Sequence, residues 1–393
     1  MDKIAINPNR LEWCCETLGM DVNAFHQEIS IAKKTLEQAM QAKAVLSIKQ
    51  LENIAKYFNR HLLFFLEPSD VVEERIYSLQ FRTINNQQPI QSQKLRKFIS
   101  TVETHRKVYL SLLEDLNIPI SQAWQDDLRL SGSLRKTADV VRHWLGLEID
   151  DKFDDLRDAV EKKGIMVIVS NGYNGRWQID KKDLTRGFCL NYDTLPIIAI
   201  KKQSKGAQAF TLMHELAHLL LHKTSMLDNE SAFHSYQGKE KEANIFASNI
   251  LMPDALLSEI DLDELQNLNI QAHDNYLAKF KKQWCVSGDA ILYRLFLENK
   301  ITQEHYQAYK NFKEEEKKRR EQEEQRQKEL GNAPIIPRTY RHREPINMFG
   351  KTYVATVLDA QQNNHITLAK ASTYLDNLKI HTLHKLEADF VSS

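Results

Sequence analysis

Glycine and proline are scarce in this chain, which has 12 and 9 of them among 393 residues. Both residues interrupt helices, so the long stretches between them favour helices over a β-rich fold. Typical domain sizes predict roughly two to four units for a chain of this length. With 42% apolar residues, each unit can bury a core.

The charges of the chain balance, with 53 acidic and 53 basic residues. This balance excludes a global field that would draw the protein onto nucleic acid or membrane. We find no run of about 18 apolar residues, and the N-terminus lacks the apolar core of a signal peptide. Four cysteines without a Cys-x-x-Cys pair favour a reducing compartment. We therefore expect a cytoplasmic protein with no membrane partner.

The order of patterns along the chain predicts helices at both ends and a small sheet between them. Residues 9–66 have the short apolar stripes of several helices, which suit either a helix-turn-helix module or a helical bundle that does not touch DNA. Three β-favouring runs follow, at residues 164–169, 187–190 and 196–200. They lead into a helix that begins near Gly206. Farther on, residues 313–329 hold seven basic and seven acidic residues, which predicts a solvated helix or a frayed linker.

The helix that follows Gly206 contains the sequence His-Glu-x-x-His. On a helix, His214 and His218 lie one turn apart and can reach the same zinc ion. Glu215 is rotated by about 100° from His214, which puts its carboxylate beside the metal as a general base. Buried polar side chains need compensation, and this helix is apolar on most sides. We therefore favour a zinc site over histidines that are merely satisfied in a core.

A catalytic zinc ion usually has three protein ligands and one open position. The third ligand is expected from the later helix near residues 239–253, and Glu240 and Glu242 are the candidates. We favour Glu242, which directly precedes the apolar face of that helix, and expect Glu240 to lie farther round. The apolar face consists of Ala243, Phe246, Ala247, Ile250 and Leu251.

The quoted motifs resemble the ImmA/IrrE family of metallopeptidases. The resemblance is carried by His-Glu-Leu-Ala-His-Leu-Leu-Leu-His at 214–222, by Glu-Ala-Asn-Ile-Phe-Ala-Ser-Asn-Ile-Leu-Met-Pro at 242–253, and by segments at 186–188 and 196–200. It covers about residues 160–255. It implies Zn²⁺ as cofactor, His214, His218 and Glu242 as its ligands, and Glu215 as general base. Lys201 departs from the family pattern, in which an asparagine follows the strand.

The N-terminal segment is similar to an Xre-type helix-turn-helix. The similarity is carried by residues 10–13, 51–55 and 63–66. This likeness implies a DNA contact through residues 31–43, with the alternative that the module binds protein or senses a signal. The side chains expected to face DNA are Lys33, Lys34, Thr35, Gln38 and Lys43.

In the loop between the metal helices, His234 and Tyr236 are candidates for stabilising an oxyanion, although exposed loop residues are the simpler interpretation.

The resulting expectation is an α+β fold, with a zincin-like metallopeptidase core and a small β-sheet, flanked by mostly helical modules. The expected domains are an Xre-like module at 1–70, a helical connector at 71–155, a zinc peptidase at 156–258, a helical subdomain at 259–332 and a small helical domain at 333–393. The family likeness implies an endopeptidase that cleaves one protein partner, a repressor or antitoxin encoded nearby. The alternatives are a DNA-binding regulator or antitoxin with a non-catalytic zinc site, and a protein that cleaves itself.

Overall fold

The computed structural model describes residues 3–58, 60–69, 71, 92–126, 128, 130, 132–172, 175–180, 183–229, 238–330 and 340–391. The chain divides into two compact units. The first comprises residues 1–107 and 173–183, and the second comprises residues 108–172 and 184–393. The five domains expected from the sequence divide the chain more finely and remain predictions.

Short helices build the first part of unit 1, as the sequence predicts. The expected stripe of Leu11, Cys14, Cys15 and Leu18 is buried. Ser47 begins α3 with a capping box, in which its hydroxyl accepts from Gln50 and the Gln50 side chain accepts from the Ser47 amide. The elements are α1 (Pro8–Thr17), η1 (Phe25–Gln27), α2 (Lys33–Ala39), α3 (Ile48–Tyr57) and η2 (Leu62–Phe65).

The long helix α5 (Gln93–Asp115) contributes residues 93–107 to unit 1 and the remainder to unit 2. In unit 1, Phe98 and His105 of α5 pack edge-on against Trp177, which lies 2% exposed. The two stretches of chain that form unit 1 are therefore joined by an aromatic contact.

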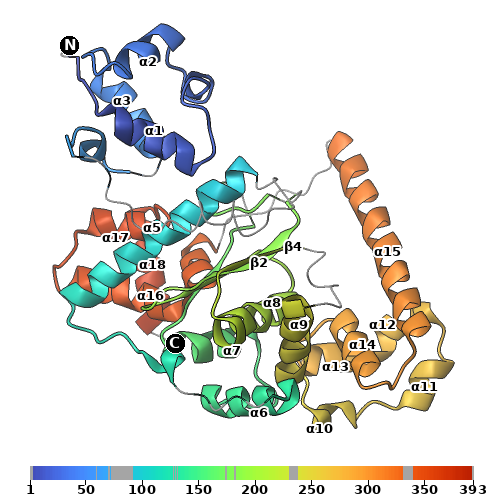
Figure 1. Cartoon of the computed structure of the whole chain (residues 1–393). Coiled ribbons are helices and arrows are strands. Elements are labelled where there is room, and N and C mark those ends of the chain that lie inside the picture. Colours follow the sequence, from blue (N-terminus) through green and yellow to red (C-terminus); the bar gives the residue numbers. More distant parts are fainter. Residues whose placement is uncertain are drawn as a thin grey trace. The chain divides into compact units, whose positions relative to one another are not determined.

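A four-stranded mixed sheet lies in unit 2 (Figure 1). Its order is β1-β3-β2-β4, with β1 parallel to β3 and the other pairs antiparallel. All residues of β1 and β3 are buried, which explains why these runs are apolar without alternation. The three predicted runs are confirmed, whereas β4 was not predicted. The strands are β1 (Met166–Val169), β2 (Thr185–Leu190), β3 (Ile197–Ile200) and β4 (Met226–Asn229).

The predicted helix near Gly206 is α8 (Lys205–Ala217), which packs against β2, β3 and the following helix α9. The Ser204 hydroxyl accepts a hydrogen bond from the Ala207 amide and caps its start. Helix α6 (Leu134–Leu145) packs on α9 (Gly238–Leu251), and α7 (Phe153–Lys162) packs on α8. The short helix η3 (Ala123–Gln125) precedes α6 in the chain.

A second group of helices continues the core of unit 2 beyond α9. Arg294, which is 1% exposed, joins them by pairing with Asp254 and Glu298. Ser287 caps the start of α14, where its hydroxyl accepts a hydrogen bond from the Ala290 amide. The elements are α10 (Asp254–Leu257), α11 (Leu262–Asn267), η6 (Ile270–Ala272), α12 (His273–Tyr276), α13 (Ala278–Gln283), α14 (Gly288–Leu297) and α15 (Gln303–Glu329).

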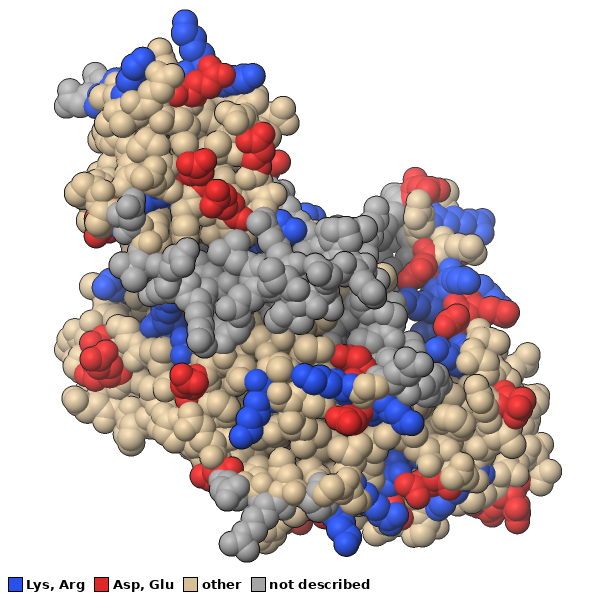
Figure 2. All heavy atoms as spheres, viewed as in Figure 1, with Lys and Arg blue, Asp and Glu red and all other residues tan. Residues whose placement is uncertain are grey.

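The charge-rich residues 313–329 form the exposed end of α15, so the solvated-helix prediction is confirmed over the frayed linker. Glu315 pairs with Arg319 and Glu316 with Arg320, each four residues apart. Figure 2 shows basic and acidic side chains interspersed along this helix and over the rest of the face in view. No basic stripe of the kind that tracks a phosphate backbone is visible on that face.

Helices from the C-terminal part complete unit 2, and α16 packs directly on β1 and α7. Gly350 interrupts α16 with φ 85° and ψ 164°. The elements are η7 (Arg341–Arg343), α16 (Glu344–Gln362), α17 (Leu368–Tyr374) and α18 (Ile380–Val391).

Among the described residues, no helix combines the length and apolar character needed to cross a membrane. The four cysteines, all within the described part, are buried and form no disulfide with one another.

Candidate metal centre

Two histidines of α8 and its continuation meet in the interior of unit 2. His214 and His218 are 0% exposed, and their Nε2 atoms lie 3.1 Å apart. His218 begins a π-helical segment, η4 (His218–His222), that continues α8. The spacing of four residues therefore brings both ring nitrogens to one point, as the sequence predicts.

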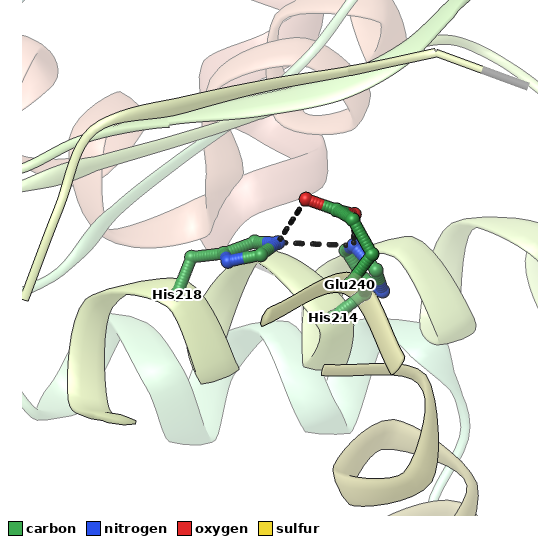
Figure 3. Close-up of side chains that lie close together, drawn as sticks. All are labelled: His214, His218 and Glu240. Atoms are coloured by element: carbon green, nitrogen blue, oxygen red, sulfur yellow. Dashed lines mark hydrogen bonds and ion pairs between the residues drawn. The ribbon is translucent and has the colours of Figure 1, made fainter. Parts of the chain in front are cut away.

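Glu240 in the first turn of α9 completes this group. Its carboxylate lies 3.3 Å from His214 Nε2 and 3.8 Å from His218 Nε2. Figure 3 shows the Glu240 side chain reaching from α9 to the two rings, with strands of the sheet above them. One donor atom from each residue lies within 4.8 Å of the other two.

Glu242, the expected third ligand, lies elsewhere. Its Oε2 atom is 3.0 Å from His222 Nε2, and its side chain is 53% exposed. The structure therefore places Glu240, and not Glu242, next to the paired histidines. The reason is helix geometry: Glu240 precedes Ala243 by three residues and Ala247 by seven, so it shares their buried face. Glu242 directly precedes Ala243, so its side chain is rotated around the helix by about 100° from that of Ala243.

His222 links Glu242 to the paired histidines. Its Nδ1 atom lies 2.8 Å from His218 Nδ1, and its Nε2 atom contacts Glu242. Burial lowers the pKa of His222, although the hydrogen bond that its ring donates to the Glu242 carboxylate opposes this effect. A chain of polar contacts thus runs from Glu242 through His222 to the outer nitrogen of His218. Such contacts fix the orientation of metal-binding histidines.

Glu215 follows His214 directly in α8 and is 0% exposed. Strand β2 passes against it at Gly187. A Cβ atom at position 187 would lie 2.7 Å from Glu215 Oε1 and 2.6 Å from Thr211 Cγ2. Glycine is therefore required here for close approach between strand and helix. The Glu215 carboxylate is consequently held between α8 and β2.

The donor set fits a zinc ion. Ligand atoms about 2.0–2.2 Å from one tetrahedral zinc are separated from each other by roughly 3.3 Å. His214 Nε2 and His218 Nε2 lie 3.1 Å apart, and the two Glu240 oxygens approach them separately, Oε2 at 3.3 Å from His214 Nε2 and Oε1 at 3.8 Å from His218 Nε2. Two imidazoles and one carboxylate also leave the fourth position of such an ion open to water or substrate.

Two of the expected site residues, His234 and Tyr236, lie outside the described residues. Lys201 follows β3 directly, and its amide donates a hydrogen bond to the Arg186 carbonyl, so it closes the end of the β2–β3 pair. Phe210, one turn before His214 on α8, stacks on the His214 ring with centroids 6.5 Å apart.

A helix that carries paired histidines beside a small mixed sheet, with a carboxylate from the next helix, belongs to a zincin-like fold. Residues 160–296 match the family model of the IrrE N-terminal-like domain, Peptidase_M78. This match supports a metallopeptidase-type function and extends past the 160–255 expected from the sequence to include most of α14. A comparison with the curated proteins found no match.

Proposed function

We propose that unit 2 is a zinc-dependent endopeptidase in which His214, His218 and Glu240 hold the metal. The observation that carries this proposal is the convergence of their three donor atoms within 4.8 Å. The fully buried Glu215 directly follows His214 on the same helix. The family match of residues 160–296 supports it independently. Glu242 takes the role of a positioning residue, which acts on His218 through His222.

A zinc ion held by His214, His218 and Glu240 would polarise the scissile carbonyl and lower the pKa of an attacking water. The Glu215 carboxylate accepts the proton of that water and delivers it to the nitrogen of the leaving amine. Contact with Gly187 keeps the carboxylate in one place, so little reorganisation is needed during the reaction. Phe210 against His214 limits how far that ring can turn.

An extended substrate segment is proposed to bind along β4. Within the described chain, β4 pairs with β2 alone and forms one edge of the sheet. An edge strand offers backbone donors and acceptors to an added peptide strand. Substrate recognition through the backbone would require the partner to expose an unfolded or extended segment.

The partner is proposed to be a single protein, a repressor or antitoxin encoded nearby, rather than proteins in general. An unrestricted zinc peptidase would damage its own cell, and helical segments on both sides of residues 160–296 are available to restrict access. The test is incubation of the zinc-loaded protein with the product of the neighbouring gene and separately with casein, followed by fragment mapping by mass spectrometry. Cleavage of the neighbour alone is expected. Brisk hydrolysis of casein would contradict narrow specificity, and fragments of the chain itself would point to self-cleavage.

A second candidate function is DNA binding by unit 1, in combination with either a catalytic or a non-catalytic zinc site. The observation that favours it is the exposure of Lys33, Lys34 and Lys43 on and after the short helix α2. The buried Glu215 favours the enzyme over the purely regulatory alternative, because a structural zinc site needs no base at that position.

A further inference from the structure

A small pocket lies beside the metal centre in unit 2, about one helical turn before His214 on α8. It is enclosed by α8, β2 and the starts of α14 and α15. Phe210 is common to the pocket and the metal centre, because its ring lines the pocket and also stacks on the ring of His214, with centroids 6.5 Å apart. The pocket and the paired histidines therefore adjoin the same aromatic side chain.

A β-bulge in β2 turns Arg186 toward this pocket. Between Thr185 and Gly187 the register of β2 against β4 shifts, which makes Arg186 the extra residue. In a regular strand, Arg186 and Gly187 would point to opposite faces of the sheet. Here a Cβ atom at Gly187 would lie 2.7 Å from Glu215 Oε1 on α8, while Arg186 lines the pocket together with Phe210 of the same helix. The bulge therefore lets the residue next to the Glu215 contact face α8 as well, and bulges redirect side chains in this way next to active sites.

The pocket is small and its inner wall is rigid. Tyr293 of α14 and Tyr306 of α15 line it and are 5% and 2% exposed. Their ring centroids lie 5.8 Å apart, and Tyr306 also stacks on Phe296. The volume of the pocket is about 40 Å³. A cavity needs about 10–15 Å³ to hold one water molecule, so the pocket has room for a side chain of only about three heavy atoms.

Two charges of opposite sign belong to the lining. Arg186 comes from β2 and Asp289 from the first turn of α14, and both are half-buried. A charged side chain of either sign in the pocket would be attracted by one of them and repelled by the other, and it would also lose water. An uncharged side chain loses less on entering. The lining therefore favours an uncharged occupant.

We propose that this pocket receives the substrate side chain next to the scissile bond and selects a small uncharged residue such as alanine or serine. The inference rests on the proposed peptidase function and adds the class of substrate: an extended segment with a small residue beside the cleaved bond. Successive side chains of an extended segment point to opposite faces, so one of them can enter the pocket while its neighbours point away. A larger side chain would have to displace Tyr293 or Tyr306, which is costly because both are buried.

The experiment uses three dipeptide hydroxamates whose side chains next to the hydroxamate are methyl, isobutyl and benzyl. A hydroxamate binds the open position of a zinc ion, so it places this side chain beside the metal centre. Isothermal titration of the whole zinc-loaded chain measures affinity without any cleavage. The methyl compound should bind most tightly, and the benzyl compound should bind at least about tenfold more weakly.

Three variants test whether the pocket causes this preference. Ala207→Leu fills the pocket from α8 without changing a metal ligand or a buried ring, and it should weaken the methyl compound at least about tenfold. Tyr293→Ala enlarges the pocket and should reduce the difference between the methyl and benzyl compounds at least about tenfold. Ala355→Leu is the control: it makes the first change at a half-buried alanine of α16 that lines a different cavity, and it should leave all affinities within about twofold. Zinc content and melting temperature show whether each variant is folded.

The possible failures separate this inference from the proposed function. Equal affinity of the three compounds for the wild type, tightest binding of the benzyl compound, or an unchanged affinity of Ala207→Leu for the methyl compound would overturn the pocket assignment and leave the peptidase proposal intact. The same holds if Ala355→Leu loses as much affinity as Ala207→Leu. If no hydroxamate binds although the protein contains zinc, the metal has no open position, and the proposed function fails together with this inference.

Discussion

At the scale of single residues, two glutamates on one helix turn have different roles in this account. Glu240 contacts the paired histidines, and Glu242 contacts His222. Glu240→Gln should lose zinc at stoichiometric metal, because an amide is a poor replacement for a charged ligand. Glu242→Gln should keep zinc with an affinity weakened by about tenfold. It alters only the contact to His222, which in turn contacts the ligand His218. Elemental analysis after gel filtration measures both, and each variant is the other's control. If only Glu242→Gln loses zinc, the third ligand is Glu242, as expected from the sequence.

Glu161 gives a second prediction at this scale, which concerns stability. Its pKa in the folded protein, about 7, exceeds the ordinary value of 4.5 because burial disfavours the charged form. The unfolded chain therefore releases this proton at lower pH than the folded chain does. The contribution of Glu161 to folding stability is thus present below about pH 4.5 and is lost as pH rises toward 7. Urea unfolding should show that the wild type loses more stability than Glu161→Gln between pH 5 and pH 8. Parallel losses would contradict the raised pKa.

At the scale of elements, the contact between β2 and α8 determines where the general base lies. Gly187→Ala inserts a methyl group within 2.7 Å of Glu215 Oε1, so the carboxylate or the strand must move. We expect peptidase activity to fall by about a hundredfold, since small misplacements of catalytic groups have effects of this size. Zinc content should stay unchanged. Gly172→Ala, whose Cβ would meet only Lys202 Cγ at 3.7 Å, is the control and should keep full activity. Normal activity of Gly187→Ala would contradict a role for β2 in positioning Glu215.

Helix α2 supports the separate prediction for DNA. Because the chain has no net charge, any DNA contact depends on local lysines such as Lys33 and Lys34. Mobility shifts on DNA from the protein's own operon should weaken steeply with added salt, and Lys33→Gln with Lys34→Gln should lower the salt slope by about two. Lys49→Gln with Lys56→Gln on α3 is the matched control. If no shift appears at low salt, unit 1 binds protein or senses a signal instead.

The elements that were predictable from the sequence are those whose signal is local. The apolar runs of β1 and β3, the Ser47 and Ser287 caps and the ion pairs of α15 follow from neighbouring residues. Strand β4 was missed because its residues Met-Leu-Asp-Asn have little β propensity, and its pairing with β2 is what makes it a strand. The proposed third ligand, Glu240, could also have been chosen from local reasoning. It lies three residues before Ala243 and seven before Ala247, so it shares their buried face.

At the scale of the whole molecule, contacts that join distant segments could not be read from the sequence. Arg157 and Glu161 are four residues apart on one helix, yet both are buried under α16, nearly 190 residues later. The cavity between α5, β1 and α16 exists only because that helix returns to β1 and α7.

The central claim is that Glu215 serves as the base of a zinc peptidase, and the most direct measurement is cleavage of the neighbouring gene product by the zinc-loaded wild type and Glu215→Gln. Both proteins should contain about one zinc per chain and melt at similar temperatures, because the variant keeps the size of the side chain. The wild type should cleave the partner, and Glu215→Gln should be slower by at least about a thousandfold. Cleavage by Glu215→Gln at the wild-type rate would contradict the account.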